Sequence, residues 1–349
     1  CSVYRMLGLF PPEILSDIIT RLWNDALTQL ILTGDKSLLK KIRCSPSYVT
    51  CLGTTKSHKL LLSFFKNVKE IEFNITSSLE ENLPAVISFS ETVDTVMVNN
   101  KISFGPTIGS LLEKILRASA GLTKLYIMDK SAKPEQVIKL LPQSVTDLSM
   151  CLGYVEQRVS RAVDSAKISK SIPKEVSKLT ILSGLSSSDV FCNFVSNLHD
   201  IESFKFYYYG FSLDENCAKS LPKSLTHLSI SSTYHGYEID ESFISNLPGS
   251  LRRITISQIT PPSLVGLPAG VETVVIKFPG GNYQTKAESF PPTVKHLEIH
   301  EFAGDIEVEA LALKLETFHH VIPSWMGVSN TKQSATGRFL KEKRRLANL

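Results

Sequence analysis

The sequence lacks the features of several protein classes. Its six cysteines include no Cys-x-x-Cys pair and no zinc-ligand spacing. They are also too sparse for a disulfide scaffold, so we expect reduced thiols and a cytoplasmic location, with the nucleus or an organelle matrix as alternatives. No apolar run is long enough to cross a bilayer, so no membrane association is predicted. No nucleotide-binding loop, serine-hydrolase elbow or zinc-protease motif occurs, which predicts no enzymatic activity, no cofactor and no small-molecule substrate.

Positive charge is scarce outside the C-terminus. Residues 331–349 hold six Lys or Arg and one Glu, a net charge of +5, whereas the whole chain carries +4. The remaining 330 residues therefore sum to −1, which argues against a basic nucleic-acid-binding surface spread over the fold. We predict a frayed basic tail over 331–349, the one segment offering a route to nucleic acid. Because the chain opens at Cys1, we also expect that an upstream segment has been removed.

What the chain does have is an internal repeat. Eleven stretches share an apolar-x-x-apolar-x-apolar core, and LPKSLTHLSI (221–230) is a representative. We call the first residue of each core the anchor. The anchors are Val68, Val93, Leu122, Val145, Val176, Ile201, Leu225, Leu251, Val271, Val294 and Leu315. Of the 33 core positions 32 are apolar, against about 14 expected from composition, and His320 is the exception.

The spacing of the repeat predicts a solenoid. The mean step between anchors is 24.7 residues, within the range of leucine-rich repeats. We predict an α/β fold: a curved parallel sheet on the concave side, and short helices and turns on the convex side. Six repeats place a proline three residues before the anchor, where the chain would enter its strand.

The connectors between strands show helical signals. Helices are predicted over 106–119 and from Pro134 to Leu141. Ser188-Asp189, Asp214 and Asp240 are expected to cap three more. The steps after Leu251 shorten to 20, 23 and 21 residues, so those connectors are predicted to lack full helices.

The form LP-x-S-L-T-x-L-x-I resembles the FNIP-type leucine-rich repeats of amoebozoan proteins. The resemblance covers residues 68–320 but lacks the FNQPL-like segment that follows the strand in that family. It implies a leucine-rich repeat solenoid, which we assign to residues 46–330.

Residues 1–45 have no repeat and contain FPPEIL (10–15). This segment resembles the opening of an F-box, although LTGDK (32–36) departs from the second half of that pattern. The resemblance implies docking on the Skp-type adaptor of cullin–RING ubiquitin ligases, with a substrate held by the repeats. The docking residues would be Leu9, Pro11, Ile14, Leu15 and Ile18.

Two functions remain open on these grounds. The first is a substrate-recognition adaptor in ubiquitination. The second is a scaffold subunit of a large cytosolic or organellar assembly, in which residues 1–45 only cap the open end of the solenoid.

Side chains of a strand alternate between faces, so the second, fourth and sixth residues after each anchor should line the concave face. The candidate partner-binding residues there are Lys124, Tyr126, Lys178, Lys205, Tyr207, Arg253, Lys277, His296, Glu298 and His319. His296, Glu298 and His300 alternate on one strand, with His319 expected beside Glu298. His296 and His300 would be about 13 Å apart, too far to share one ion, so we predict a polar contact surface and no metal.

Overall fold

The computed structural model describes the residues that carry the repeats. They are 47–52, 68–75, 93–100, 113, 116–117, 121–128, 134–152, 165–208, 211–232, 239–257, 264–277, 286–300, 307–321 and 335–347. The predicted docking residues, Leu9, Pro11, Ile14, Leu15 and Ile18, lie outside them. The chain forms two compact units, Cys1–Tyr154 and Val155–Leu349, and each is described by itself.

The first unit contains parallel strands in sequence order. They are β1 (Ser47–Leu52), β2 (Val68–Ile75), β3 (Thr95–Asn100), β4 (Lys124–Ile127) and β5 (Asp147–Cys151). Helix α8 (Pro134–Lys139) begins at the predicted proline and connects β4 to β5. Residues 113, 116 and 117 of the segment predicted as a helix over 106–119 are helical, and Leu116 is buried.

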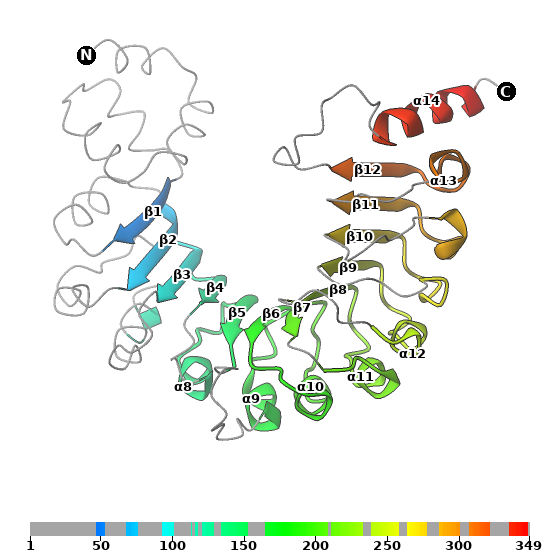
Figure 1. Ribbon diagram of the computed structural model, residues 1–349. Helices are drawn as coiled ribbons and strands as arrows, with labels where there is room; N and C mark the ends of the chain where they lie inside the picture. Colours follow the sequence, from blue (N-terminus) through cyan, green and yellow to red (C-terminus); the bar gives the residue numbers. More distant parts are fainter. Residues whose placement is uncertain are drawn as a thin grey trace, which may run out of the picture. The chain divides into compact units, whose positions relative to one another are not determined.

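The second unit continues the same pattern (Figure 1). Its strands are β6 (Lys178–Ser183), β7 (Ser203–Tyr208), β8 (His227–Ser232), β9 (Arg253–Ser257), β10 (Thr273–Lys277), β11 (His296–His300) and β12 (Thr317–Val321). Each pairs in parallel with the next. Along one side of this sheet lie α9 (Ser165–Ser171), α10 (Ser188–Val195), α11 (Glu215–Lys219), α12 (Glu241–Ser245), the 3₁₀ turn η2 (Ala287–Ser289) and α13 (Val308–Lys314).

The core consists of the positions that the repeat predicts. Every anchor whose side chain is described is at most 1% exposed, and the apolar residues three and five positions later are buried as well. Each described strand from β3 to β12 begins two residues after its anchor. The apolar half of the repeat therefore forms the buried inner layer between the sheet and the connectors.

The repeated proline has a more specific role than strand entry. Its carbonyl accepts a hydrogen bond from the backbone N–H of the anchor three residues later, which closes a turn. The bond occurs in all six repeats that contain the proline, at 2.9–3.2 Å, as from Leu225 to Pro222. Since proline lacks its own N–H, it cannot continue the helical segment that precedes it in most of these repeats, as α11 precedes Pro222.

The serine before the anchor connects neighbouring repeats. Its hydroxyl donates to the carbonyl of the preceding anchor: Ser144 to Leu122 at 2.6 Å, Ser224 to Ile201 at 3.0 Å and Ser250 to Leu225 at 2.7 Å. The L-P-x-S-L form is thus explained by a turn that closes on itself and bonds to the turn of the preceding repeat.

The helices pack apolar side chains on the sheet. Phe191 of α10 lies 4.9 Å from Phe206 and 6.4 Å from Phe204 of β7, measured between ring centroids. The N-caps of α11 and α12 are Asp214 and Asp240, as predicted. The cap of α10 is Ser187, one residue before the predicted pair, and it accepts from the N–H of Val190 at 3.2 Å.

Two expectations for the C-terminal region were wrong. The connector between β11 and β12 contains α13, a seven-residue helix, although this connector was predicted to lack a full helix. Residues 331–349 are not simply a frayed tail, because they contain α14 (Ala335–Ala347). Phe339 of α14 is 1% exposed and lies 5.6 Å from the ring of Phe318 on β12, so this basic helix covers the core of the last repeat.

Candidate functional site

The polar residues of β6–β12 share one face of the sheet in the second unit. The parallel register places the second residue after each anchor in one row, so Lys178, Ser203, His227, Arg253, Thr273, His296 and Thr317 follow one another. The fourth and sixth residues form two further rows. We call these three rows the polar face.

The polar face contains the candidate residues that were predicted for these strands. Lys178, Arg253 and His296 lie in the first row, Lys205, Glu298 and His319 in the second, and Tyr207 and Lys277 in the third. Lys178, Arg253 and His319 are exposed, and the other five are partly exposed. Contact of these residues with a partner stays a prediction.

Glu298 is the electrostatic centre of one end of this face. Its carboxylate contacts Nε2 of His300 on the same strand, and Nη2 of Arg253, two strands away, lies 4.0 Å from it. The hydrogen bond from His300 and the charges of His300, Lys277 and Arg253 hold its pKa below the usual range, against the opposing effect of burial. Glu298 is therefore ionised at neutral pH and is surrounded by cationic groups.

The other end of the face also has a positive field. Burial lowers the pKa of His227, and the nearby charges of Arg253 and Lys178 lower it further, against the smaller opposing effect of Glu202. Lys205 extends its ammonium over the ring of Tyr207, with Nζ 5.2 Å from the ring centroid. This cation–π contact holds the lysine and the aromatic ring together on the exposed side of β7.

The first unit presents a different surface. Lys124 opens β4 and is exposed, and the hydroxyl of Tyr126 donates to Oδ2 of Asp147 on the neighbouring strand at 3.3 Å. Burial, together with the charge and hydrogen bond of Asp147, raises the pKa of Tyr126 to about 12. Tyr126 is therefore held by the sheet itself, less free to anchor a partner than the sequence suggests.

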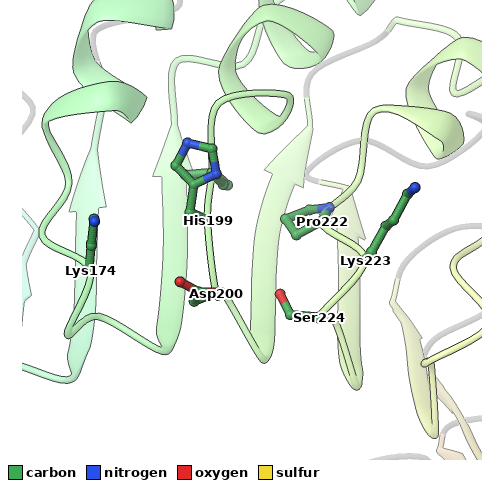
Figure 2. A pocket seen from close by; sticks show the side chains of 7 residues that line it. Lys174, His199, Asp200, Pro222, Lys223 and Ser224 are labelled. Atoms are coloured by element: carbon green, nitrogen blue, oxygen red, sulfur yellow. The ribbon is translucent and has the colours of Figure 1, made fainter.

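Sequence reasoning missed a depression at the turns of the second unit (Figure 2). A cavity of about 490 Å³ is lined by Lys174, Leu198, His199, Asp200, Pro222, Lys223 and Ser224. The signal was present in the sequence. The neighbouring repeats enter their strands through the five-residue form apolar-Pro-x-x-anchor, whereas this repeat uses the four residues Leu198-His199-Asp200-Ile201. Because this turn is one residue shorter, it leaves room between the turns on either side. Asp200 adopts a left-handed backbone with φ of 57° to complete this turn.

Among the residues that the structure describes, neither the depression nor the polar face brings together the side chains of a catalytic site. The sulfurs of Cys192 and Cys217 lie 3.7 Å apart on α10 and α11. Burial raises the pKa of Cys217 to about 12, so its thiol is protonated and a poor nucleophile at neutral pH.

Across the same part of the chain, no three His, Cys, Asp or Glu side chains cluster so as to hold a metal ion. No described helix has the length and apolar composition needed to span a bilayer.

Comparison with known proteins identifies the fold. No protein-family model and no curated protein matches the chain. The crystal structure of the leucine-rich repeat-containing protein LegL7 from Legionella pneumophila matches with a TM-score of 0.55 at 13% identity, over 86% of this chain and 98% of that one. The fold is a leucine-rich repeat solenoid. This confirms the predicted fold class.

Two further solved structures match with lower TM-scores. A chain of the Toll–Spatzle complex of Drosophila matches with a TM-score of 0.47 at 10% identity, over 83% of this chain and 40% of that one. A chain of the Rad7–Elc1 complex of yeast matches with a TM-score of 0.41 at 12% identity, over 86% and 89%. These likenesses concern the fold, and the F-box and FNIP resemblances stay predictions.

Proposed function

We propose that this chain is a protein-recognition module whose polar face binds a partner. The observation that carries the proposal is the arrangement of the second unit. Its helices lie on one side of the sheet (Figure 1), and the register places three rows of mostly polar and aromatic residues on the other side. Rigid strands hold these side chains at fixed spacing, which favours recognition of a large surface.

We further propose that the chain acts as a substrate-recognition adaptor of a cullin–RING ubiquitin ligase in the cytoplasm. The support is the F-box-like segment FPPEIL before the repeats. In this proposal residues 1–45 dock a Skp-type adaptor, residues 46–330 hold the substrate and residues 331–349 form a basic C-terminal segment. The alternative is a scaffold subunit of a large assembly with no role in ubiquitination.

Affinity purification of the tagged full chain from its native source, followed by mass spectrometry, tests both the recognition role of the polar face and the role in ubiquitination. Ile14→Asp would place a charge in an apolar docking surface, at a cost of several kcal/mol. We expect this variant to lose a Skp-type adaptor and cullin while retaining the substrate. Tyr207→Ala should show the reverse pattern, because it removes an aromatic side chain from the polar face.

Lys219→Ala is the matched control, because Lys219 is exposed on α11, on the opposite side of the sheet. Circular dichroism confirms that each variant is folded. Recovery of assembly subunits without a Skp-type adaptor would replace the ubiquitin role with the scaffold role. Identical partners for Tyr207→Ala and the wild type would overturn the recognition role of the polar face.

A further inference from the structure

The polar face of the second unit has a strong charge bias. Its basic, histidine and acidic members are Lys178, Lys205, Arg253, Lys277, His227, His296, His300, His319 and Glu298. Within β6–β12, Glu298 is the only acidic residue on this face, whereas the whole chain has nearly equal numbers of acidic and basic residues. The bias therefore belongs to the face and does not follow from composition.

The single carboxylate does not neutralise the face. Arg253 and His300 already contact Glu298, while Lys178 and Lys205 lie on β6 and β7, away from β11. The charges of Arg253 and Lys178 disfavour protonation of His227, which lies between them, and the charge of Glu202 offsets this effect only in part. A ligand that brings negative charge to this region would relieve the repulsion.

The spacing of the cations fits an extended chain. Seven strands at about 4.8 Å give about 29 Å across the face, the length of roughly nine residues of extended peptide. Cationic or imidazole side chains occur on β6, β7, β8, β9, β10, β11 and β12. Lys205 and Tyr207 add an aromatic surface next to a cation.

We propose that this face binds an extended acidic segment of a partner protein, across β6–β12. The inference rests on the recognition role proposed above and specifies the chemistry of the partner. Acidic side chains of the segment pair with the Lys and Arg side chains, and the segment avoids Glu298 or presents a polar residue to it.

A protein ligand fits this face better than a nucleic acid. Nucleic-acid surfaces are much more positive than four Lys and Arg side chains over seven strands, and a regular phosphate backbone would bring charge to Glu298. An acidic peptide can vary its residues along the face, so it can match the cations and avoid the carboxylate.

The test uses the full chain and a fluorescein-labelled ten-residue glutamate peptide, with a ten-residue glutamine peptide as the neutral probe. Fluorescence anisotropy at 50 mM NaCl should detect binding of the acidic peptide, and binding should weaken on raising salt to 300 mM. The double variant Lys205→Glu/Arg253→Glu should weaken binding on the order of tenfold or more. Lys219→Glu makes a charge change of the same kind on the helical side and should alter affinity less than twofold.

Glu298→Gln provides a test in the opposite direction. Removing the one carboxylate should strengthen peptide binding on the order of two- to fivefold, a gain that misfolding cannot imitate. Equal binding of the two peptides, an equal effect of Lys219→Glu, or no gain for Glu298→Gln would overturn the proposal. Tighter binding of a ten-nucleotide oligouridine with the same dependence on Lys205 and Arg253 would replace the acidic protein with RNA. Failure of the peptide to bind, while Tyr207 is still required for partner capture, would overturn the acidic partner and leave the proposed function intact.

Discussion

The hydroxyl of Ser250 should stabilise the solenoid through one bond between repeats. Ser250→Ala removes the 2.7 Å hydrogen bond to the carbonyl of Leu225 and changes no apolar contact in the core. A bond of this kind contributes about 1 kcal/mol, rising to about 3 kcal/mol if the partly buried carbonyl finds no other donor. For a chain of this length we expect the melting temperature to fall by about 2 °C, accompanied by a lower urea midpoint.

A matched control exists in another repeat. Thr293 occupies the corresponding position before the anchor Val294, but its buried hydroxyl has no hydrogen-bond partner among the residues that the structure describes. Thr293→Ala should therefore cost less than Ser250→Ala, because it loses no bond between repeats, and the loss of its γ-methyl group is offset by removal of a buried hydroxyl that has no partner.

The measurements are urea unfolding followed by far-ultraviolet circular dichroism, and hydrogen exchange of the backbone amides near residues 225 and 250. The second reads local stability, since distant repeats of a solenoid need not unfold together. Exchange should accelerate near these residues in Ser250→Ala and remain unchanged near them in Thr293→Ala. Equal destabilisation by the two variants would refute the hydrogen-bond explanation of the serine in the repeat.

Four further changes have defined outcomes. Gly270→Ala should destabilise the protein by about 1–3 kcal/mol in urea unfolding, because a Cβ would lie 2.9 Å from two backbone carbonyl oxygens; no loss would contradict this packing. Asp200→Gly should stabilise it by about 0.5–1 kcal/mol, since glycine adopts a φ of 57° without strain, and an unchanged urea midpoint would argue against strain there. Phe339→Ala should weaken the docking of α14 by about 3 kcal/mol and accelerate its hydrogen exchange, whereas unchanged protection would show that the helix does not depend on this side chain. The pKa of Cys217, raised by burial to about 12, lies above the value of about 8.5 in an unfolded chain, so stability should fall as pH rises from about 9 toward 12. Cys217→Ala should reduce that loss in urea midpoints compared at pH 8 and pH 10, and an identical pH dependence would assign the effect to other groups.

The core could be predicted because three positions in each repeat must be apolar. Leu228 and Ile230, for example, are buried for the same geometric reason as Leu297 and Ile299. His320, the polar exception, lies on β12, the last strand of the series. It stacks near Phe318, and its backbone N–H donates to Thr336 of α14 at 2.8 Å. The polar residue at this core position thus occurs where β12 is followed by helix α14 instead of another repeat.

Where the prediction of elements was incomplete, the departures have local causes. Strand β1 was not counted among the repeats because its sequence offers Val49 and Cys51 but has Pro46 in place of an apolar anchor. Helix α13 fits into a step of 21 residues because Lys314 leads directly to Leu315 without a proline turn. Lys314 Nζ then donates to the carbonyl of Ala287 at 2.8 Å and to that of Phe290.

Helix α14 was obscured by its composition. Its many Lys and Arg residues indicate a solvated segment when charge is counted alone, yet Phe339 is buried against Phe318 of β12 and the helix also packs on α13. The net charge of residues 331–349 therefore predicted the exposed side of α14 but not the formation of the helix.

The candidate site could be located but not characterised from the repeat. Alternation places Lys205 and Arg253 on the polar face as surely as it places Phe204 and Ile254 in the core. The contacts around Glu298, by contrast, join residues of different repeats and depend on side-chain conformations that no spacing rule specifies.

Within each repeat, the residues that stabilise the fold differ from the residues that form the polar face, so the charge bias of that face needs its own explanation. Folding uses the anchor, the two later apolar positions and the turn before the anchor, and on β6–β12 it buries only a few of the side chains at the second, fourth and sixth positions, such as Val275 and Ser231. The side chains that stay exposed there should reflect the average composition, in which acidic and basic residues are nearly equal. Instead four Lys or Arg residues and four His residues face one Glu across β6–β12. The acidic protein segment proposed above as the ligand would account for this bias through charge complementarity.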